Sequence, residues 1–191
     1  GLIIFCSDCA SNEGELQVRL TSSWINLHNG GDVNDPGTLA IGDTHQGGIV
    51  FYLDGSGGGL IAAPSDQSSA MWGCYGQSIG GTGSALGTGA ANTTAIVSGC
   101  SETAIASRIC EDLTLGGYSD WFLPSKDELN LMYSNIGQGS LLENIGNFAE
   151  NYYWSSTEVD VIYAWAQIFF NGYQDGKAKG YTTNVRAVRA F

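Results

Sequence analysis

The C-terminal stretch EVDVIYAWAQIFFNGYQDGKAKGYTTNVRAVRAF, residues 158–191, carries a clear strand pattern. Side chains alternate in character across 162–171 and again across 181–191, and a period of two residues is typical of β-strands. Segment 171–180 between them contains glycines and Asp175, which favour a reversal of chain direction. The pattern therefore predicts a terminal β-hairpin.

Both faces of the first predicted strand are apolar. Trp165 and Phe169 would point to one side, and Ile168 and Phe170 to the other. A strand buried on both sides explains this pattern, and so does one buried face with an exposed apolar face opposite. We hypothesise that the hairpin presents a binding surface and that the remaining chain is its frame.

Aromatic side chains in this hairpin are the candidate ligand contacts: Tyr163, Phe170, Tyr173 and Tyr181. A tyrosine offers contact area and a hydroxyl at a small entropic cost, and its ring can stack on the apolar face of a sugar. Tyr173 and Tyr181 lie beside turn residues, which favours exposure, whereas Phe170 fits sheet core equally well. An alternative function is a structural or assembly domain in which Ile168 and Phe170 are covered by another subunit.

Composition indicates a packed, loop-rich and acidic protein. The 191 residues include 28 glycines and 11% aromatic residues, which argue against disorder. Seven Lys+Arg against 19 Asp+Glu give a formal net charge of −12. Nucleic acids, sulfated polymers and anionic membranes would be repelled by this charge. Neutral glycans, proteins and divalent cations remain as partners.

The five cysteines predict two disulfides and one free thiol. We pair Cys6 with Cys9 and Cys74 with Cys100, and expect Cys110 to be a buried thiol. A zinc site at Cys6 and Cys9 is the alternative, but a second ligand pair is missing. Disulfides indicate an oxidising compartment, so we expect an extracellular, cell-surface or virion location.

Turn signals divide the chain into three parts. Residues 1–28 are predicted to be a short β unit, a stalk or connector with strands near 2–5, 15–20 and 23–27. Residues 29–42, rich in glycine and turn residues, are the predicted linker, and 43–191 the ligand-binding domain. No stretch reaches the length of a membrane span. The apolar start GLIIF resembles the middle of a strand, so we expect the chain to be a fragment of a longer one.

The main domain alternates strand and helix signals. A hairpin is predicted from 48–53 and 60–63, followed by a glycine-rich loop over 73–91. That loop has no GK[ST] ending, so a disulfide-tied loop is favoured over a phosphate cradle. Helices are predicted from Asn92 and over about 102–113, and another begins at Ser125 with Glu128 completing a capping box. A strand is expected over 152–157.

Three motifs occur in order: GGIVFYLD with LIAAPSD (47–66), GGYSDWFLPSKDELNLMY (116–133), and YYWSSTE (152–158) with NVRAVRAF (184–191). Together they resemble the domain family named for the C-terminal region of the Legionella collagen-like adhesin. The resemblance implies an α+β, C-type-lectin-like fold with two main helices, a small twisted antiparallel sheet and long irregular loops. It also implies a cell-surface or phage-borne module that attaches to a host or bacterial surface protein or a glycan. The named adhesin is a trimer that binds sulfated polysaccharides; the charge of this chain disfavours that ligand but leaves a homotrimer open.

A second resemblance concerns the C-terminal stretch. Some lectin-fold proteins, members of this family included, are variable proteins of diversity-generating retroelements, which replace adenines at Asn codons and so vary exposed side chains. Lys177 is the exception among the matching positions, because it is not reachable from an Asn codon in this way. The substituted positions would be Ile162, Tyr163, Ala166, Ile168, Phe170, Tyr173, Asp175, Gly176, Ala178, Gly180, Tyr181 and Thr183. The predicted ligand-binding residues are Ile162, Tyr163, Ala166, Ile168, Phe170, Tyr173, Asp175, Lys177, Tyr181 and Thr183.

A calcium site is an alternative that the acidic residues raise, because Ca²⁺ prefers several oxygen ligands. Asp120, Asp127, Glu128 and Glu158 are the first candidates. Asp127 and Glu128 are already explained by the first turn of a helix, where negative charge is favoured, and Asp120 by the GGYSDW turn. We therefore predict no metal and no cofactor. Further unassigned carboxylates are Asp54, Asp66, Asp160 and Asp175.

Two arginines and three tryptophans are expected to be structural. Arg186 and Arg189 should hold the last strand by pairing with carboxylates such as Glu158 or Asp120. The tryptophans predicted to be core are Trp121, Trp154 and Trp165.

Catalysis is not indicated by the sequence. The two histidines lie in predicted loops, and no Ser, Asp and His order gives a triad. Formylglycine-generating enzymes share the implied fold class but need a cysteine pair near the C-terminal core, and no cysteine follows Cys110. We predict that the protein is not an enzyme.

Overall fold

The computed structural model describes residues 3–6, 16–20, 23–26, 39–80 and 82–191. Its contacts divide the chain into two compact units, Gly1–Ala40 and Ile41–Phe191. The first unit contains a three-stranded antiparallel sheet in the order β1-β2-β3, at the places where the sequence predicted strands. Cys9 and most of the predicted linker lie outside the described residues, so the Cys6–Cys9 disulfide stays a prediction. The strands are β1 (Ile3–Cys6), β2 (Leu16–Leu20) and β3 (Ser23–Asn26).

A four-stranded sheet in the second unit joins the start of this unit to the end of the chain. Its order is β12-β6-β5-β4, and the predicted β5–β6 hairpin is confirmed. The turn between these two strands is held by Asp54, whose Oδ1 accepts hydrogen bonds from the backbone N–H of Ser56 and Gly58. The strands are β4 (Thr44–His45), β5 (Gly48–Leu53), β6 (Gly59–Ala62) and β12 (Val188–Ala190).

A five-stranded sheet in the order β10-β9-β8-β11-β7 contains most of the C-terminal stretch. All its neighbours are antiparallel except β8 and β11, which are parallel. The strands are β7 (Ser68–Met71), β8 (Tyr152–Glu158), β9 (Tyr163–Ile168), β10 (Gln174–Ala178) and β11 (Thr182–Val185).

The predicted hairpin between 162–171 and 181–191 is wrong. β9 pairs with β10, which is built from residues assigned to the turn, while β12 pairs with β6 in the other sheet. The chain reverses at Asn171 and Gly172, where Gly172 has φ +78° and its N–H bonds to the Ile168 carbonyl. The connection is a four-residue loop, 169–172, closed by a hydrogen bond from the Ile168 N–H to the Tyr173 carbonyl, and Gly172 supplies its positive φ.

The described part of the second unit contains three helices, where the resemblance implied two main ones. α3 begins at the predicted capping box: Ser125 Oγ accepts from the Glu128 N–H, and Glu128 accepts from the Ser125 N–H. The first helix begins three residues before Asn92, whose buried side chain bonds to Gly83 and does not cap the helix. The helices are α1 (Gly89–Gly99), α2 (Ala106–Glu111) and α3 (Lys126–Ile136).

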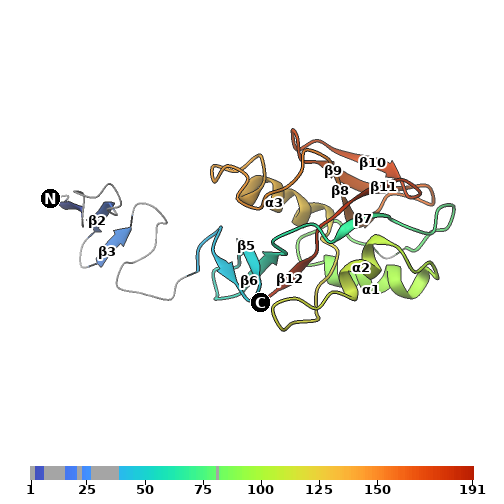
Figure 1. The fold of residues 1–191 in the computed structure, drawn as a ribbon, viewed down its shortest axis with the longest axis horizontal. Coiled ribbons are helices and arrows are strands. Elements are labelled where there is room, and N and C mark those ends of the chain that lie inside the picture. The colour runs from blue at the N-terminus through green and yellow to red at the C-terminus, as the bar shows by residue number, and fades with distance from the viewer. Residues whose placement is uncertain (1–2, 7–15, 21–22, 27–38, 81) are drawn as a thin grey trace. The chain divides into compact units, whose positions relative to one another are not determined.

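Two hydrophobic clusters lie on opposite faces of β8, because neighbouring residues of a strand point to opposite sides. Trp154 packs in the cluster that contains α1 and α2, and Tyr153 in the cluster that contains α3. Figure 1 shows α3 and the α1–α2 pair on different sides of the five-stranded sheet. Trp121 and Trp154 are buried as predicted, whereas Trp165 is half-buried beneath the Lys126 ammonium.

The predicted Cys74–Cys100 disulfide is confirmed, with an S–S distance of 2.07 Å. It ties the irregular loop before α1 to the end of that helix. Cys110 is a buried free thiol as predicted, and burial raises its pKa. No helix of the described part is long and apolar enough to cross a membrane.

Candidate functional site

Large side chains of the C-terminal stretch reach solvent, as the ligand-contact hypothesis requires. Tyr173 and Tyr181 are 60% and 65% exposed, which confirms the expectation for residues beside turns. Phe170, which the sequence left undecided between core and surface, is 60% exposed at the β9–β10 turn. These three exposed rings mark a candidate contact surface.

The register of β9 and β10 separates the predicted residues onto two faces. Asp175 pairs with Ala166 and Lys177 with Ala164, so both lie on the face that continues to Ile168. Tyr163 pairs with Ala178 and belongs to the opposite face. The predicted contact residues therefore do not form one surface, and Tyr163 is separated from Asp175 and Lys177.

Ala166 was predicted to contact ligand, and this is wrong. It is 1% exposed and packs in the cluster that contains Trp154 and the first two helices. Small side chains at Ala164 and Ala166 let that core approach the centre of β9 closely. Ile162, Ile168 and Lys177 are half-buried, and Thr183 is nearly buried at 8% exposure.

A hollow of about 250 Å³ lies beside these residues, between β10 and β11 and next to β8. Lys177, Tyr181 and Thr183 are the predicted residues that it brings together. The Lys177 Nζ lies 3.7 Å from the centroid of the Tyr152 ring, a cation–π contact that fixes the lysine at the wall. The lining residues are Asn151, Tyr152, Lys177, Tyr181, Thr182, Thr183 and Asn184.

We call the surface formed by Ile168, Tyr173, Asp175, Lys177 and Tyr181, together with the lining of this hollow, the tyrosine patch. Sequence reasoning missed Tyr152, Asn151, Thr182 and Asn184. Tyr152 was assigned to the predicted strand 152–157, but the sequence prediction did not say to which side of the sheet its side chain points. Alternation places Tyr152 on the same face of β8 as the buried Trp154, so no local signal marked it as part of the site.

A buried ion pair lies at the base of the loop that carries Tyr181. Lys179 Nζ is 2.5 Å from Glu158 Oε1 and also donates to the Gln77 carbonyl. Glu158 further accepts from the backbone N–H of Ile79 and Gly80. Burial alone would raise the pKa of Glu158, but the hydrogen bonds from Lys179 and these amides outweigh it, and the pKa is lowered.

Both C-terminal arginines hold the last residues of the chain as predicted, although one partner differs. Arg189 pairs with Asp120, and this hydrogen bond lowers the pKa of the Asp120 carboxyl. Arg186 pairs with Asp66 at 2.6 Å and donates to the Ala63 and Gly146 carbonyls. Glu158, the other predicted partner, forms its ion pair with Lys179 instead.

The first candidate calcium ligands do not converge in the described part of the chain. Glu128 is buried at the start of α3, Asp120 is paired with Arg189 and Glu158 with Lys179. Burial raises the pKa of Glu128, in part offset by hydrogen bonds from Ser125, Gly87 and Gly89.

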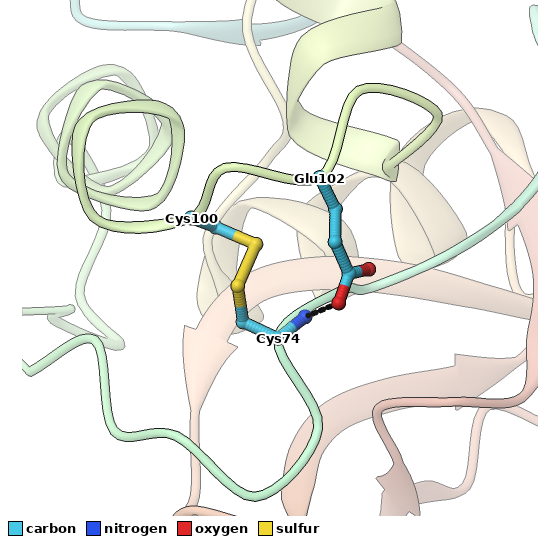
Figure 2. Close-up of side chains that lie close together, drawn as sticks. All are labelled: Cys74, Cys100 and Glu102. Carbon is cyan, nitrogen blue, oxygen red and sulfur yellow. Dashed lines mark hydrogen bonds between the residues drawn. A yellow bond between two sulfur atoms is a disulfide. The ribbon is translucent and has the colours of Figure 1, made fainter.

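One close group of potential metal ligands is found in the described part: Cys74, Cys100 and Glu102. Figure 2 shows that the two sulfurs are joined and that Glu102 faces the backbone of Cys74, whose N–H it accepts at 3.1 Å. Metal binding by cysteine requires a thiolate, and both sulfurs here are in a disulfide. This group is therefore a disulfide-linked loop and not a metal centre.

Comparison with known proteins bears on most of the second unit. The family model of the Lcl C-terminal domain matches residues 67–189. The chain belongs to the Lcl C-terminal domain family. The match includes every strand of the five-stranded sheet, so the tyrosine patch is part of the Lcl C-terminal domain.

No curated protein matches the sequence. Among solved structures, a fimbrial protein from Bacteroides ovatus ATCC 8483 is similar, with a TM-score of 0.53 and 13% sequence identity. The match covers 92% of this chain but 56% of the fimbrial protein. At this identity the likeness concerns the fold alone.

Proposed function

We propose that this Lcl C-terminal domain is an extracellular recognition module with a C-type-lectin-like fold. It attaches, without catalysis, to a surface protein or a neutral glycan through the tyrosine patch. The observation that carries this proposal is the exposure of Tyr173 and Tyr181 on a scaffold held by buried ion pairs, one of which, Lys179–Glu158, lies at the base of the loop that carries Tyr181. The family is named for an adhesin, and the similar structure is a fimbrial protein, both of which agree with a place on a cell surface.

Charge also supports this choice of partners. The formal net charge is −12, and Lys179, Arg186 and Arg189 are each engaged by a carboxylate. Few cations are left to face an anionic polymer, so a polyanion would meet a net repulsive field. Aromatic contact area with hydroxyl and amide groups suits proteins and neutral sugars instead.

The test is a double substitution, Tyr173→Ala with Tyr181→Ala, assayed by capture on an array of surface proteins and glycans with and without calcium. We expect capture to be lost while the melting temperature stays unchanged, because both rings are largely exposed. Tyr163→Ala is the matched control, since it removes an exposed tyrosine from the opposite face. Equal loss of capture in the control would contradict the proposal.

Exposed apolar area supports one other function, an assembly domain in which Ile168, Phe170 and Tyr173 are covered by another subunit. Phe170 and Tyr173 are each 60% exposed, and such area is typical of protein contacts. Sedimentation of the full chain separates the two functions. A monomer, or a trimer in which Tyr173→Ala leaves assembly intact, favours recognition; a trimer that dissociates on this substitution favours assembly.

Diversification by a retroelement is the proposed origin of the patch. Phe170, Tyr173, Asp175 and Tyr181 are exposed members of the set reachable from Asn codons, as such a mechanism requires. Ala166 is a buried member and would be expected to stay small. An Asn-rich near copy of the coding segment beside a reverse transcriptase gene would establish this origin, and its absence from the complete genome would exclude it.

A further inference from the structure

The hollow in the tyrosine patch has a lining that differs in charge from the rest of the protein. The chain as a whole has 19 acidic residues, yet the described lining of the hollow contains no carboxylate and one cation, Lys177. Aromatic rings, hydroxyls and side-chain amides supply the remaining surface. Its volume of about 250 Å³ is below the range of about 300–1,000 Å³ for pockets that take drug-sized ligands. A single ring-sized ligand therefore matches its size.

Thr183 provides a second, independent observation. It lines the hollow and is 8% exposed, and its Oγ1 makes no hydrogen bond within the described part of the chain. Buried hydroxyls are nearly always hydrogen-bonded, so an orphaned one at the wall of a hollow points to a missing partner. Rotation of the Thr183 side chain would let a ligand hydroxyl supply that bond.

Tyr181 gives the hollow an exposed aromatic face, whereas the Tyr152 ring is covered on one side by the Lys177 ammonium. The Lys177 ammonium lies over Tyr152, and Tyr181 is 65% exposed. A ring with apolar C–H groups on one face and hydroxyls at its edge would stack on Tyr181 and bond to Thr183. Lys177 can also donate hydrogen bonds to hydroxyls from its fixed position.

We propose that the hollow binds one neutral pyranose ring of a glycan, without calcium. The inference rests on the proposed recognition function and assigns it a ligand class and a place. Tyr181 is the stacking platform, and Thr183, Asn151 and Lys177 are the hydrogen-bonding groups. An anionic sugar is disfavoured because Asp175 lies two residues from Lys177 on the same face of β10 and the net charge is −12.

The experiment is an NMR titration of the full ¹⁵N-labelled chain in EDTA. The probes are the methyl pyranosides of glucose, galactose, mannose, fucose and N-acetylglucosamine, with methyl glucuronide as the anionic counterpart. We expect at least one neutral glycoside to shift the backbone amides of 181–184 in a saturable way. Thr183→Val should weaken that binding about tenfold, the equivalent of one hydrogen bond. Its melting temperature should not fall, because the hydroxyl that it removes has no partner.

Tyr163→Ala is again the control and should bind the glycoside like the parent chain. Binding of the glucuronide alone, binding that EDTA abolishes, or no shift at 181–184 with any neutral glycoside would each overturn the inference. The broader proposal has its own readout, the capture array with Tyr173→Ala and Tyr181→Ala. Loss of capture there, combined with no glycoside binding here, would leave recognition standing and assign it to a protein partner.

Discussion

The two halves of the C-terminal stretch share an alternating pattern of apolar residues and have opposite environments. β10 is an edge strand of the five-stranded sheet, and the residues that flank β9 and β10 reach solvent at Phe170, Tyr173 and Tyr181. Residues 185–189 are buried without interruption, and both of their arginines are paired with carboxylates. Alternating apolar residues define a strand in both halves. The neighbours that the strand meets decide whether its faces are covered.

The second half of the C-terminal stretch therefore contributes stability, and the first half contributes contact surface. Variants in the two halves should therefore separate loss of folding from loss of binding.

The largest effect is expected from Arg186→Met in the buried half. Arg186 is 1% exposed and joins Asp66 to the Ala63 and Gly146 carbonyls. Removing one partner of a buried pair costs about 3–5 kcal/mol, because the remaining groups stay desolvated. Chemical denaturation measures the loss. Lys126→Met removes a half-exposed cation and should cost less than about 1 kcal/mol; equal losses would show that Arg186 is not a structural centre.

A smaller loss is expected when the disulfide is removed. Cys74 and Cys100 are 26 residues apart and both buried, and a disulfide closing a loop of this size contributes about 2–4 kcal/mol. Cys74→Ala with Cys100→Ala should lower the free energy of unfolding by that amount. Reducing agent should lower the stability of the parent chain equally and leave the variant unchanged. A reductant effect on the variant as large as that on the parent chain would contradict this assignment.

The dependence of stability on pH should have opposite signs at two glutamates. The pKa of Glu158 is lowered, so its ionised form stabilises the fold above the unfolded pKa of about 4.3, and this is lost as the pH falls further. The pKa of Glu128 is raised by burial, so its contribution is present below that pH and lost as the pH rises through the folded pKa.

Thermal melts of Glu158→Gln and Glu128→Gln between pH 3 and about 7 test these signs. Relative to the parent chain, Glu158→Gln should be least stable at neutral pH and recover on acidification. Glu128→Gln should have its highest stability relative to the parent chain at neutral pH. Parallel curves for the two variants would show that neither shift contributes to folding.

Local signals were sufficient for much of the fold. The capping box at Ser125, the β5–β6 hairpin and the Cys74–Cys100 pairing each depend on residues close in sequence or on chemistry with few alternatives. The strand that pairs with β12 could not be predicted from such local signals. β6 lies more than a hundred residues earlier in the sequence, and nothing local in 184–191 distinguishes it from β9 as a partner.

The site was predictable in its aromatic members and not in its geometry. Tyr173 and Tyr181 were identified because turn residues flank them. Tyr163 was grouped with them because its face depends on the register with β10, and β10 had been assigned to a turn. The hollow combines side chains from β8, β10 and β11, so its existence follows from strand order and not from any single motif.

The smallest effect on stability belongs to the tyrosine patch, and a matched pair of tyrosines tests it. Tyr153 is fully buried and its hydroxyl donates to Asp66, whereas Tyr181 is 65% exposed. Tyr153→Ala should cost about 3–5 kcal/mol, as for other large core residues. Tyr181→Ala should stay within about 0.5 kcal/mol of the parent chain, because substitutions of largely exposed side chains change stability little. Denaturation curves of the two variants measure this difference. A large loss at Tyr181 would show that the ring supports the fold, and the stability of the open half would then depend on the surface proposed to bind ligand.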